Sequence, residues 1–380
     1  MPHNSPMSIL IKSDKPLVVV GMSSGVDSSA AAALLLEAGY EVHGLTLRTW
    51  RVSTADDAPV IDQADAVAAA LGIPLHVTDA RERFYHDVVV PFADAYARGL
   101  TPNPCVMCNP TLKFAALLDA ADCLGAAWIA TGHYARIERA PDGPTHLLRA
   151  CNPHKDQSYA LYRLTQTHLS RLLLPLGTVE SKEAVRDIAR RHGLPSAERE
   201  DSQDLCFMGR GDYRALLTAL HAEAFRPGPI YNEAGEQLGE HRGLPGYTIG
   251  QRSGMGIAAR ERLYVLRKDA ARNTLIVGPR AALLRDTCTL EAMTFTAGAP
   301  PTREFAARGR VRYRAPRVPV EVTLLPGNRA RVSLREPQAG LAPGQSLVLY
   351  AGERVLGGGI ICADQERAGT VPEDADTALF

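Results

Sequence analysis

The chain has 380 residues, which is more than a domain with one hydrophobic core usually contains and is enough for two or three domains. Its composition, 46% hydrophobic and 22% charged, is that of a globular protein, and no apolar run reaches the length of a membrane span. The formal net charge is zero, which argues against a protein that coats nucleic acid through charge alone, although a local basic face stays compatible with it.

Residues 1–15 lack the apolar core of a signal peptide and are expected to form a flexible leader. We therefore expect a cytoplasmic protein. In that reducing compartment the seven cysteines are not expected to form persistent structural disulfides.

Strand and helix signals alternate through the first half of the chain. Strand patterns at 16–22, 41–47, 73–79 and 126–132 alternate with helix patterns at 28–40, 62–72, 112–125 and 182–193. This order is typical of a doubly wound parallel sheet covered by helices. We assign this α/β fold to residues 16–220.

The pattern changes after a helix-like segment at 212–225, because Gly and Pro then separate short β-type runs with no clear helix between them. This half is predicted to be all-β. We expect a small central β domain at 221–284, a C-terminal β-barrel at 285–365 and a disordered acidic tail at 366–380.

A polar loop connects the first strand to the first helix. Its backbone N–H groups and hydroxyls are expected to converge on the positive end of the helix dipole, which suits a phosphate group. No Gly-Lys-Ser/Thr sequence follows, so it is not a Walker A loop. The predicted phosphate-binding residues are Gly21, Met22, Ser23, Ser24, Gly25, Val26, Asp27 and Ser28.

Two cysteines, Cys105 and Cys108, lie in the polar segment TPNPCVMCNP at 101–110. They could be metal ligands, a redox pair or reagents in a reaction. A structural zinc site needs two further ligands, and no second C-x-x-C or His pair is present, so we predict no metal site. Cys123, Cys151, Cys288 and Cys362 lie in apolar settings and are expected to be buried packing residues.

The phosphate loop resembles the S-G-G-x-D-S loop of the N-type ATP pyrophosphatases, whose α/β domain is adenine nucleotide alpha hydrolase-like. Further motifs follow in order: TPNPCVMCNPTLKF, TGHYAR, HKDQSYALYRL, EDSQDLCFMGRGDYRALL, GYTIGQRSGMGI, VRYRAP and APGQSLVLYAGERVLGGGII. Together they resemble the bacterial tRNA-specific 2-thiouridylases over nearly the whole chain, from about 16 to 361.

The resemblance implies a sulfur transfer to tRNA. ATP, with Mg²⁺, would adenylate the 2-oxygen of the wobble uridine, and a protein persulfide would replace that oxygen by sulfur. The persulfide cysteine of the family matches Cys206, and the second, disulfide-forming cysteine matches Cys108. The implied partners are the anticodon stem-loops of Lys, Glu and Gln tRNAs and a sulfur donor such as a cysteine desulfurase or a sulfur-relay protein.

The resemblance also implies contacts for nucleotide and RNA. Leu47 and Gly132 would join the loop in binding ATP, and Asn103, Pro104 and Cys105 would face the target base. The implied tRNA contacts are His133, Lys155, Asp156, Gln157, Arg312, Tyr313 and Gln345. From the alternation of Arg310, Arg312 and Arg314 with apolar residues we expect one strand face that binds phosphates.

Three positions depart from the family pattern. Ser24 stands where Gly is usual, Cys105 where many relatives carry Asp, and Pro110 follows the second cysteine atypically. We expect Ser24 to be tolerated if its φ is negative or only mildly strained. Three alternatives stay open: an iron–sulfur cluster on Cys105, Cys108 and Cys206, a ligase of the same superfamily that transfers nitrogen, and a non-catalytic tRNA-binding protein with a degenerate loop.

Overall fold

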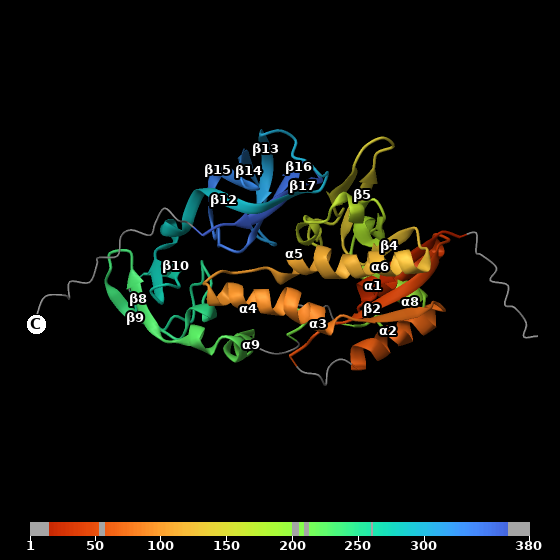
Figure 1. Ribbon diagram of the computed structural model, residues 1–380, viewed down its shortest axis with the longest axis horizontal. Helices are drawn as coiled ribbons and strands as arrows, with labels where there is room; N and C mark the ends of the chain where they lie inside the picture. Colours follow the sequence, from red (N-terminus) through yellow and green to blue (C-terminus); the bar gives the residue numbers. More distant parts are fainter. Residues whose placement is uncertain (1–14, 53–57, 200–204, 209–212, 260, 364–380) are drawn as a thin grey trace, which may run out of the picture.

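The computed structural model describes residues 15–52, 58–199, 205–208, 213–259 and 261–363. The predicted tail and all of the predicted leader except Lys15 lie outside these residues. Figure 1 shows an α/β domain at one end of the molecule, a small β domain at the other and a β-barrel above them. The predicted fold class is therefore confirmed.

The α/β domain is built on a five-stranded parallel sheet with the strand order β3-β2-β1-β4-β7. The order reverses beside β1, so the crevice between β1 and β4 is the switch point where such sheets bind ligands. The strands are β1 (Leu17–Gly21), β2 (Glu41–Arg48), β3 (Leu75–Asp79), β4 (Trp128–Thr131) and β7 (Leu172–Leu173).

Helices cover both faces of this sheet because successive side chains of a strand point to opposite faces. Val19 of β1 packs with the helix that begins at Phe114, whereas Val18 and Val20 pack with the first two helices. The regular helices are α1 (Val26–Glu37), α2 (Ala58–Leu71), α6 (Phe114–Leu124) and α8 (Lys182–Arg191).

A second helical layer leads from the α/β domain towards the small β domain and carries two wide π-turns. Its elements are α3 (Arg81–Phe84), η2 (Tyr85–Val89), α4 (Val90–Ala97), α5 (Pro104–Cys108) and η3 (Asn109–Lys113). Shorter helical turns are η4 (Ser158–Leu161), α7 (Gln166–Leu169) and η5 (Pro175–Thr178). Turns of π-type often mark functional sites, and here η3 begins directly after Cys108.

The small β domain follows the helix α9 (Tyr213–Leu220) and has the strand order β10-β11-β8-β9. Its strands are β8 (Gly228–Asn232), β9 (Gln237–His241), β10 (Tyr264–Asp269) and β11 (Thr274–Gly278), with the helical turns η6 (Ala222–Phe225), η7 (Leu244–Gly246) and η8 (Arg280–Leu283). The sheet closes over its own core around Ile230, Val265 and Leu275.

The C-terminal barrel closes because β12 pairs with both β15 and β17. Its strands are β12 (Leu284–Phe295), β13 (Glu304–Arg310), β14 (Val318–Leu325), β15 (Arg329–Ala339), β16 (Ser346–Ala351) and β17 (Arg354–Ile361). The hairpin β5 (Ala135–Arg139) and β6 (Thr145–Arg149) comes from the α/β half of the chain, yet β6 pairs with β17 and extends the barrel sheet. This union of the two domains was not predicted from the sequence.

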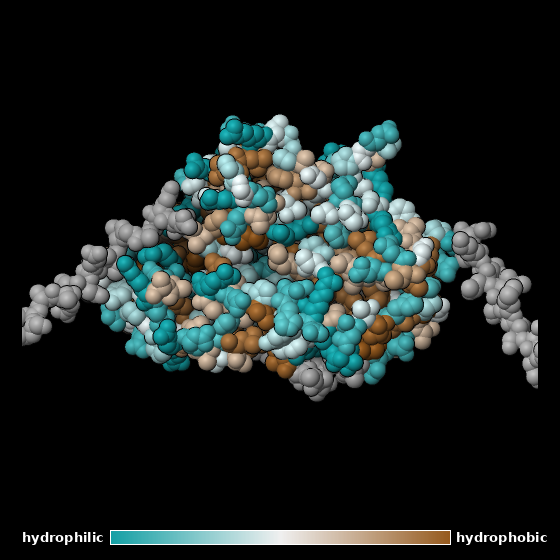
Figure 2. Space-filling model, in the orientation of Figure 1, coloured by the Kyte–Doolittle hydropathy of each residue, from teal (hydrophilic) through white to brown (hydrophobic). Residues whose placement is uncertain are grey.

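Figure 2 shows one face of the molecule, on which hydrophobic residues form small groups among hydrophilic ones. No helix among the described residues has both the length and the apolar character needed to cross a membrane.

Candidate active site

The predicted phosphate loop lies at the switch point of the sheet. Gly21 ends β1, and Leu47 lies near the end of β2, the next strand. Gly132 directly follows β4, and a Cβ on it would lie 2.6 Å from the carbonyl carbon of Asp27 and 2.7 Å from the backbone nitrogen of Ser28. Position 132 therefore needs glycine, because the chain after β4 touches the first turn of α1.

Hydrogen bonds among serines hold the loop in shape. The backbone N–H of Ser23 donates to the Ser28 hydroxyl at 3.2 Å, which in turn donates to the Gly25 carbonyl at 3.0 Å. Ser24 is buried and has φ +61°, in the left-handed region that favours glycine. Ser24 therefore does not meet the condition of a negative φ, and its conformation is one that Gly adopts without a steric cost.

Sequence reasoning missed two cationic side chains at the loop, Lys182 and Arg199. Lys182, the first residue of α8, contacts the Asp27 carboxylate at 2.7 Å. The Tyr134 hydroxyl donates a hydrogen bond to the same oxygen at 2.6 Å. The Arg199 guanidinium donates to the Ser24 carbonyl at 3.2 Å. The Ser181 cap predicted α8, but nothing local indicated that its first residue reaches Asp27, 155 positions earlier in the chain.

The two cysteines of the 101–110 segment lie on one short helix. Asn103 caps α5 by accepting a hydrogen bond from the Cys105 backbone N–H at 3.2 Å, and Pro104 occupies the first turn, where its missing N–H costs nothing. Cys108 is buried and Cys105 is half-buried. The predicted base-contacting residues therefore form the first turn of the helix that carries Cys108.

The structure brings Cys206 to this helix although 98 residues separate it from Cys108. Phe207 and Met208, the two residues after Cys206, pack in the same hydrophobic cluster as Cys108 and Leu112. Cys206 itself is exposed, and all three cysteines are free thiols. Parts of the motif around Cys206, residues 200–204 and 209–212, lie outside the described residues.

Lys113, at the end of η3, interacts electrostatically with all three thiols. Burial raises the pKa of Cys108 to about 12 and also raises the pKa of Cys105, while the positive charge of Lys113 opposes both shifts. Burial lowers the pKa of Lys113, but the charges of Cys206, Cys108 and Cys105 outweigh it, so the net shift is upward. Lys113 thus stays charged, and Cys108 is protonated at neutral pH in this state.

His133 lies between this cluster and the phosphate loop. Its Nδ1 is 2.9 Å from the Thr131 hydroxyl. Its ring packs against that of Phe114, with 6.0 Å between the ring centroids. Burial, helped by the charge of Lys113, lowers the pKa of His133 to about 3, so the ring is neutral. A neutral imidazole can donate one hydrogen bond and accept another, but it offers no charge to RNA.

The predicted tRNA contacts at 155–157 differ from one another in their surroundings. Gln157 accepts a hydrogen bond from the Tyr134 backbone N–H at 3.0 Å, which ties this segment to the residue that holds Asp27. Lys155 is half-buried in the turn before it. The Asp156 carboxylate is fully buried, and it accepts hydrogen bonds from the backbone N–H groups of Ala150 and Ser158.

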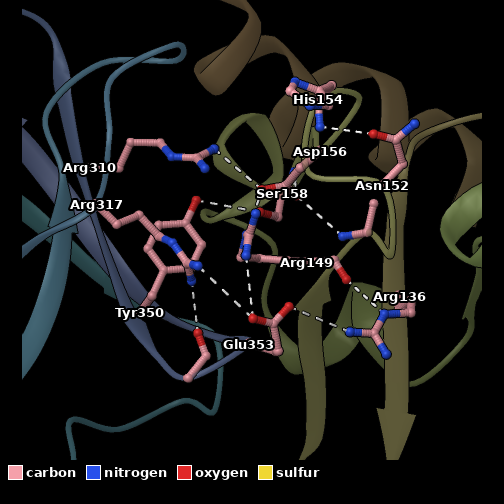
Figure 3. Close-up of polar contacts among 12 residues, drawn as sticks. Arg136, Arg149, Asn152, His154, Asp156, Ser158, Arg310, Arg317, Tyr350 and Glu353 are labelled. Carbon is pink, nitrogen blue, oxygen red and sulfur yellow. Dashed lines mark hydrogen bonds and ion pairs between the residues drawn. The ribbon is translucent and has the colours of Figure 1, made fainter.

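Figure 3 shows that Asp156 lies between Arg149 of the hairpin strand β6 and Arg310 of the barrel strand β13. Its Oδ2 is 3.0 Å from Arg149 and 3.3 Å from Arg310. Arg149 also contacts Glu353 at 3.3 Å, next to β17. Through these contacts Asp156 joins the barrel to the α/β domain, and its direct contact with tRNA stays a prediction.

The predicted arginine stripe in the barrel is wrong. β13 ends at Arg310, which is buried against Asp156, and residues 311–315 form a turn, so Arg312 and Arg314 cannot share a strand face with Arg310. Val311, the first residue after the strand, is buried in the barrel core. Arg312 and Tyr313 remain exposed on the turn.

Two of the predicted barrel contacts, Gln345 and Tyr313, pack against the α/β domain near the cysteine helix. Gln345 donates its side-chain amide to the Thr101 carbonyl at 2.6 Å, and the Thr101 N–H donates to the Pro343 carbonyl at 2.9 Å. The Tyr313 ring packs against Tyr159 at 6.0 Å. The barrel therefore touches the segment directly before Asn103 and Pro104.

Two further expectations concern cysteines and metals. Cys288 is buried and Cys362 half-buried, but Cys123 and Cys151 are exposed, so their predicted burial is wrong. Cys123 lies on an exposed face of α6 and Cys151 in the turn after β6, which local apolar composition did not reveal. Within the described part of the chain, no group of three or more His, Cys, Asp or Glu side chains is arranged to hold a metal ion.

The fold and the loop together define a nucleotide-binding α/β domain joined to two β domains. A family model described as "tRNA methyl transferase HUP domain" matches residues 16–210, and models described as "tRNA methyl transferase PRC-barrel domain" and "Aminomethyltransferase beta-barrel domain" match 218–279 and 285–361. The chain is 48% identical to a protein from Chloroflexus aurantiacus and 46% identical to one from Paramagnetospirillum magneticum, both named tRNA-specific 2-thiouridylase MnmA.

These alignments cover 90% and 93% of this chain and 98% of each relative. The chain belongs to the tRNA-specific 2-thiouridylase family. A solved structure titled as the U34-tRNA thiolase NcsA from Methanococcus maripaludis aligns with TM-score 0.33 and 15% identity over 56% of this chain and 66% of that chain, a likeness too weak to carry an argument.

Proposed function

We propose that this protein is an ATP-dependent tRNA 2-sulfurtransferase that converts the wobble uridine to 2-thiouridine and releases AMP and pyrophosphate. The observation that carries the proposal is the position of His133. Its neighbour Gly132, directly after β4, touches the phosphate loop. His133 itself interacts electrostatically with Lys113, which also interacts with the three thiols. A nucleotide site and a sulfur-carrying site therefore share one edge of the sheet.

The nucleotide half of the site is supported by its donors. Backbone N–H groups of the loop, the Ser23 and Ser28 hydroxyls and the cations Lys182 and Arg199 surround the start of α1. Such a set suits the phosphates of ATP. ATP supplies the adenylate that turns the uridine 2-oxygen into a leaving group, and Mg²⁺ would accompany its phosphates.

The sulfur half follows from two cysteines with different exposure. Exposed Cys206 can accept sulfur from a donor protein as a persulfide, whose terminal sulfur attacks C2 of the adenylated uridine and displaces AMP. The Cys108 thiolate then attacks Sγ of Cys206, the S–S bond to the transferred sulfur breaks, and its electron pair leaves with 2-thiouridine. A Cys108–Cys206 disulfide remains, and two electrons from cellular thiols reset it.

The free state protects this chemistry. Cys108 is buried and protonated, so it is a weak nucleophile until a movement exposes it or brings it closer to Lys113. The helix that carries it begins directly after the Thr101 contact with the barrel. Binding of tRNA across barrel and α/β domain is the event that would shift this helix.

The partners follow from the same proposal: a cytoplasmic enzyme acting on the anticodon stem-loops of Lys, Glu and Gln tRNAs, supplied by a cysteine desulfurase or a sulfur-relay protein. The test is nucleoside mass spectrometry of tRNA after incubation with ATP, cysteine and a cysteine desulfurase. We expect 2-thiouridine with the wild type. Its absence, with no AMP release in the presence of tRNA, would favour a non-catalytic tRNA-binding protein.

Variants distinguish the persulfide from the iron–sulfur alternative. Cys206→Ser should accept no labelled sulfur, whereas Cys108→Ser should accept it at Cys206 yet form neither thiouridine nor a disulfide. Cys105→Ser should retain substantial activity, because Cys105 is assigned only to the base pocket. Loss of activity in all three variants, together with iron and inorganic sulfide in anaerobically purified wild type, would replace the persulfide by a cluster.

A further inference from the structure

A cavity of about 230 Å³ lies at the joint between the small β domain and the barrel. Its lining residues are Gly250, Tyr264, Arg280 and Leu283 from the small β domain and Arg312, Ala339 and Gly340 from the barrel. Arg280 begins η8, the turn that leads directly into β12. The cavity is therefore shared by two domains, and no acidic side chain is among its lining residues.

The charges in this cavity are unmatched. Arg280 and Arg312 are exposed, and neither guanidinium makes a hydrogen bond or an ion pair with any residue that the structure describes. By contrast, Arg310 and Arg317, close by in sequence, contact Asp156 and Glu353. Two free guanidinium groups facing one small cavity match the oxygens of a phosphate, which they can bind by paired hydrogen bonds.

The remaining lining leaves room for such a ligand. A Cβ on Gly340 would lie 3.3 Å from Nη1 of Arg312, so a side chain there would crowd the guanidinium. The Tyr264 hydroxyl makes no hydrogen bond within the described residues and offers a third donor. The cavity is thus lined by two guanidinium groups, one tyrosine hydroxyl and glycine backbone that no side chain covers.

The cavity lies at the end of a series of residues that begins at the cysteine helix and runs through Tyr313 and Arg312. The phenol of Tyr313 is within electrostatic range of Cys105, and its ring packs against Tyr159. Arg312 is the next residue back along the chain, and it leads to Arg280 across the cavity. An RNA strand with one base at the cysteine helix would pass Tyr313 and place a neighbouring phosphate near Arg312.

We propose that this cavity binds a backbone phosphate of the tRNA beside the target nucleotide, and that Arg280 of the small β domain is one of its ligands. The inference rests on the proposed function and extends the RNA contact to a domain for which none was predicted. A free phosphate anion has the same chemistry, so the experiment separates the two sources.

The experiment measures binding of a synthetic anticodon stem-loop to the full chain by fluorescence anisotropy over a range of salt concentrations. Arg280→Gln should weaken binding about tenfold and lower the slope of log K against log salt by about one. Arg280→Lys should keep most of the slope. The matched control is Arg331→Gln, an exposed arginine of the barrel strand β15 that does not line the cavity.

Stem-loops with one neutral methylphosphonate at each position then identify the phosphate. At one position the replacement should weaken binding to the wild type about tenfold and leave binding to Arg280→Gln unchanged, because the contact is already lost. In parallel, inorganic phosphate is titrated while thermal unfolding is followed. We expect inorganic phosphate to stabilise the wild type no more than it stabilises Arg280→Gln. A stabilisation that is lost in Arg280→Gln and kept in Arg331→Gln would indicate a site for free phosphate.

Three outcomes would overturn the inference: equal RNA binding by the wild type and Arg280→Gln, no methylphosphonate position coupled to Arg280, or stabilisation by inorganic phosphate without any effect on RNA. If Arg280→Gln binds RNA normally while the wild type forms 2-thiouridine, only this inference fails. If the wild type binds no tRNA, the proposed function fails with it.

Discussion

Removing the carboxylate of Asp156 should loosen the barrel from the α/β domain. Asp156→Ala leaves the guanidinium groups of Arg149 and Arg310 without the oxygen they share, and it leaves two backbone N–H groups without an acceptor. Breaking a buried ion pair by deleting one partner costs about 3–5 kcal/mol, since the other charge stays buried. We expect a loss of this size in the free energy of unfolding.

The assay is urea unfolding followed by two signals. Both tryptophans, Trp50 and Trp128, lie in the α/β domain, so their fluorescence reports that domain, whereas circular dichroism includes the barrel strands. In Asp156→Ala the two transitions should separate, because the hairpin β5–β6 is then held to the barrel by fewer contacts. Glu353→Gln is the matched control: its side chain is 51% exposed, and we expect a loss below about 1 kcal/mol.

Two results would refute this reasoning. One is a change below about 0.5 kcal/mol in Asp156→Ala, equal to that in Glu353→Gln, since surface substitutions stay within that range. The other is a tRNA affinity that falls in Asp156→Asn while unfolding is unchanged, which would restore Asp156 as a direct RNA contact.

Four further predictions concern the active site. Ser24→Gly should stabilise the fold by about 1 kcal/mol in urea unfolding, because a left-handed φ costs an L-residue about 1–2 kcal/mol, and the KM for ATP should change less than about tenfold; a larger drop in KM would mean that the natural loop is impaired. Asp27→Ala should abolish AMP release, measured by chromatography, while the protein still unfolds cooperatively. Normal turnover in this variant would contradict the assignment of the loop at 21–28 to ATP binding. Iodoacetamide at pH 8 should label Cys206 well before Cys108 by peptide mass spectrometry, and the Cys108 rate should keep rising towards pH 12 because its thiolate forms only there; equal rates at pH 8 would contradict its burial. In Lys113→Met the Cys105 and Cys108 rates at a given pH should fall further, whereas Lys113→Arg should preserve them.

Local patterns were sufficient for the elements that form the nucleotide site. The run 16–22, the loop at 21–28 and the Ala-rich helix after it predicted β1, the phosphate loop and α1, because alternation, turn residues and helix periodicity are properties of neighbouring residues. The order of strands and helices likewise predicted the parallel sheet. The ordered motifs placed Cys108 and Cys206 in one reaction, although the sequence contained no information on their burial.

Contacts between distant residues decided the rest. The segment at Arg310 has a strand-like pattern, yet β13 ends there, and Arg310 contacts Asp156, 154 positions earlier in the chain. Lys182 reaches Asp27, and β6 pairs with β17, through similar separations that no window of sequence samples. Burial, charge pairing and the positive φ of Ser24 are properties of the assembled chain, because they depend on which groups exclude water from one another, and only the tertiary structure determines that.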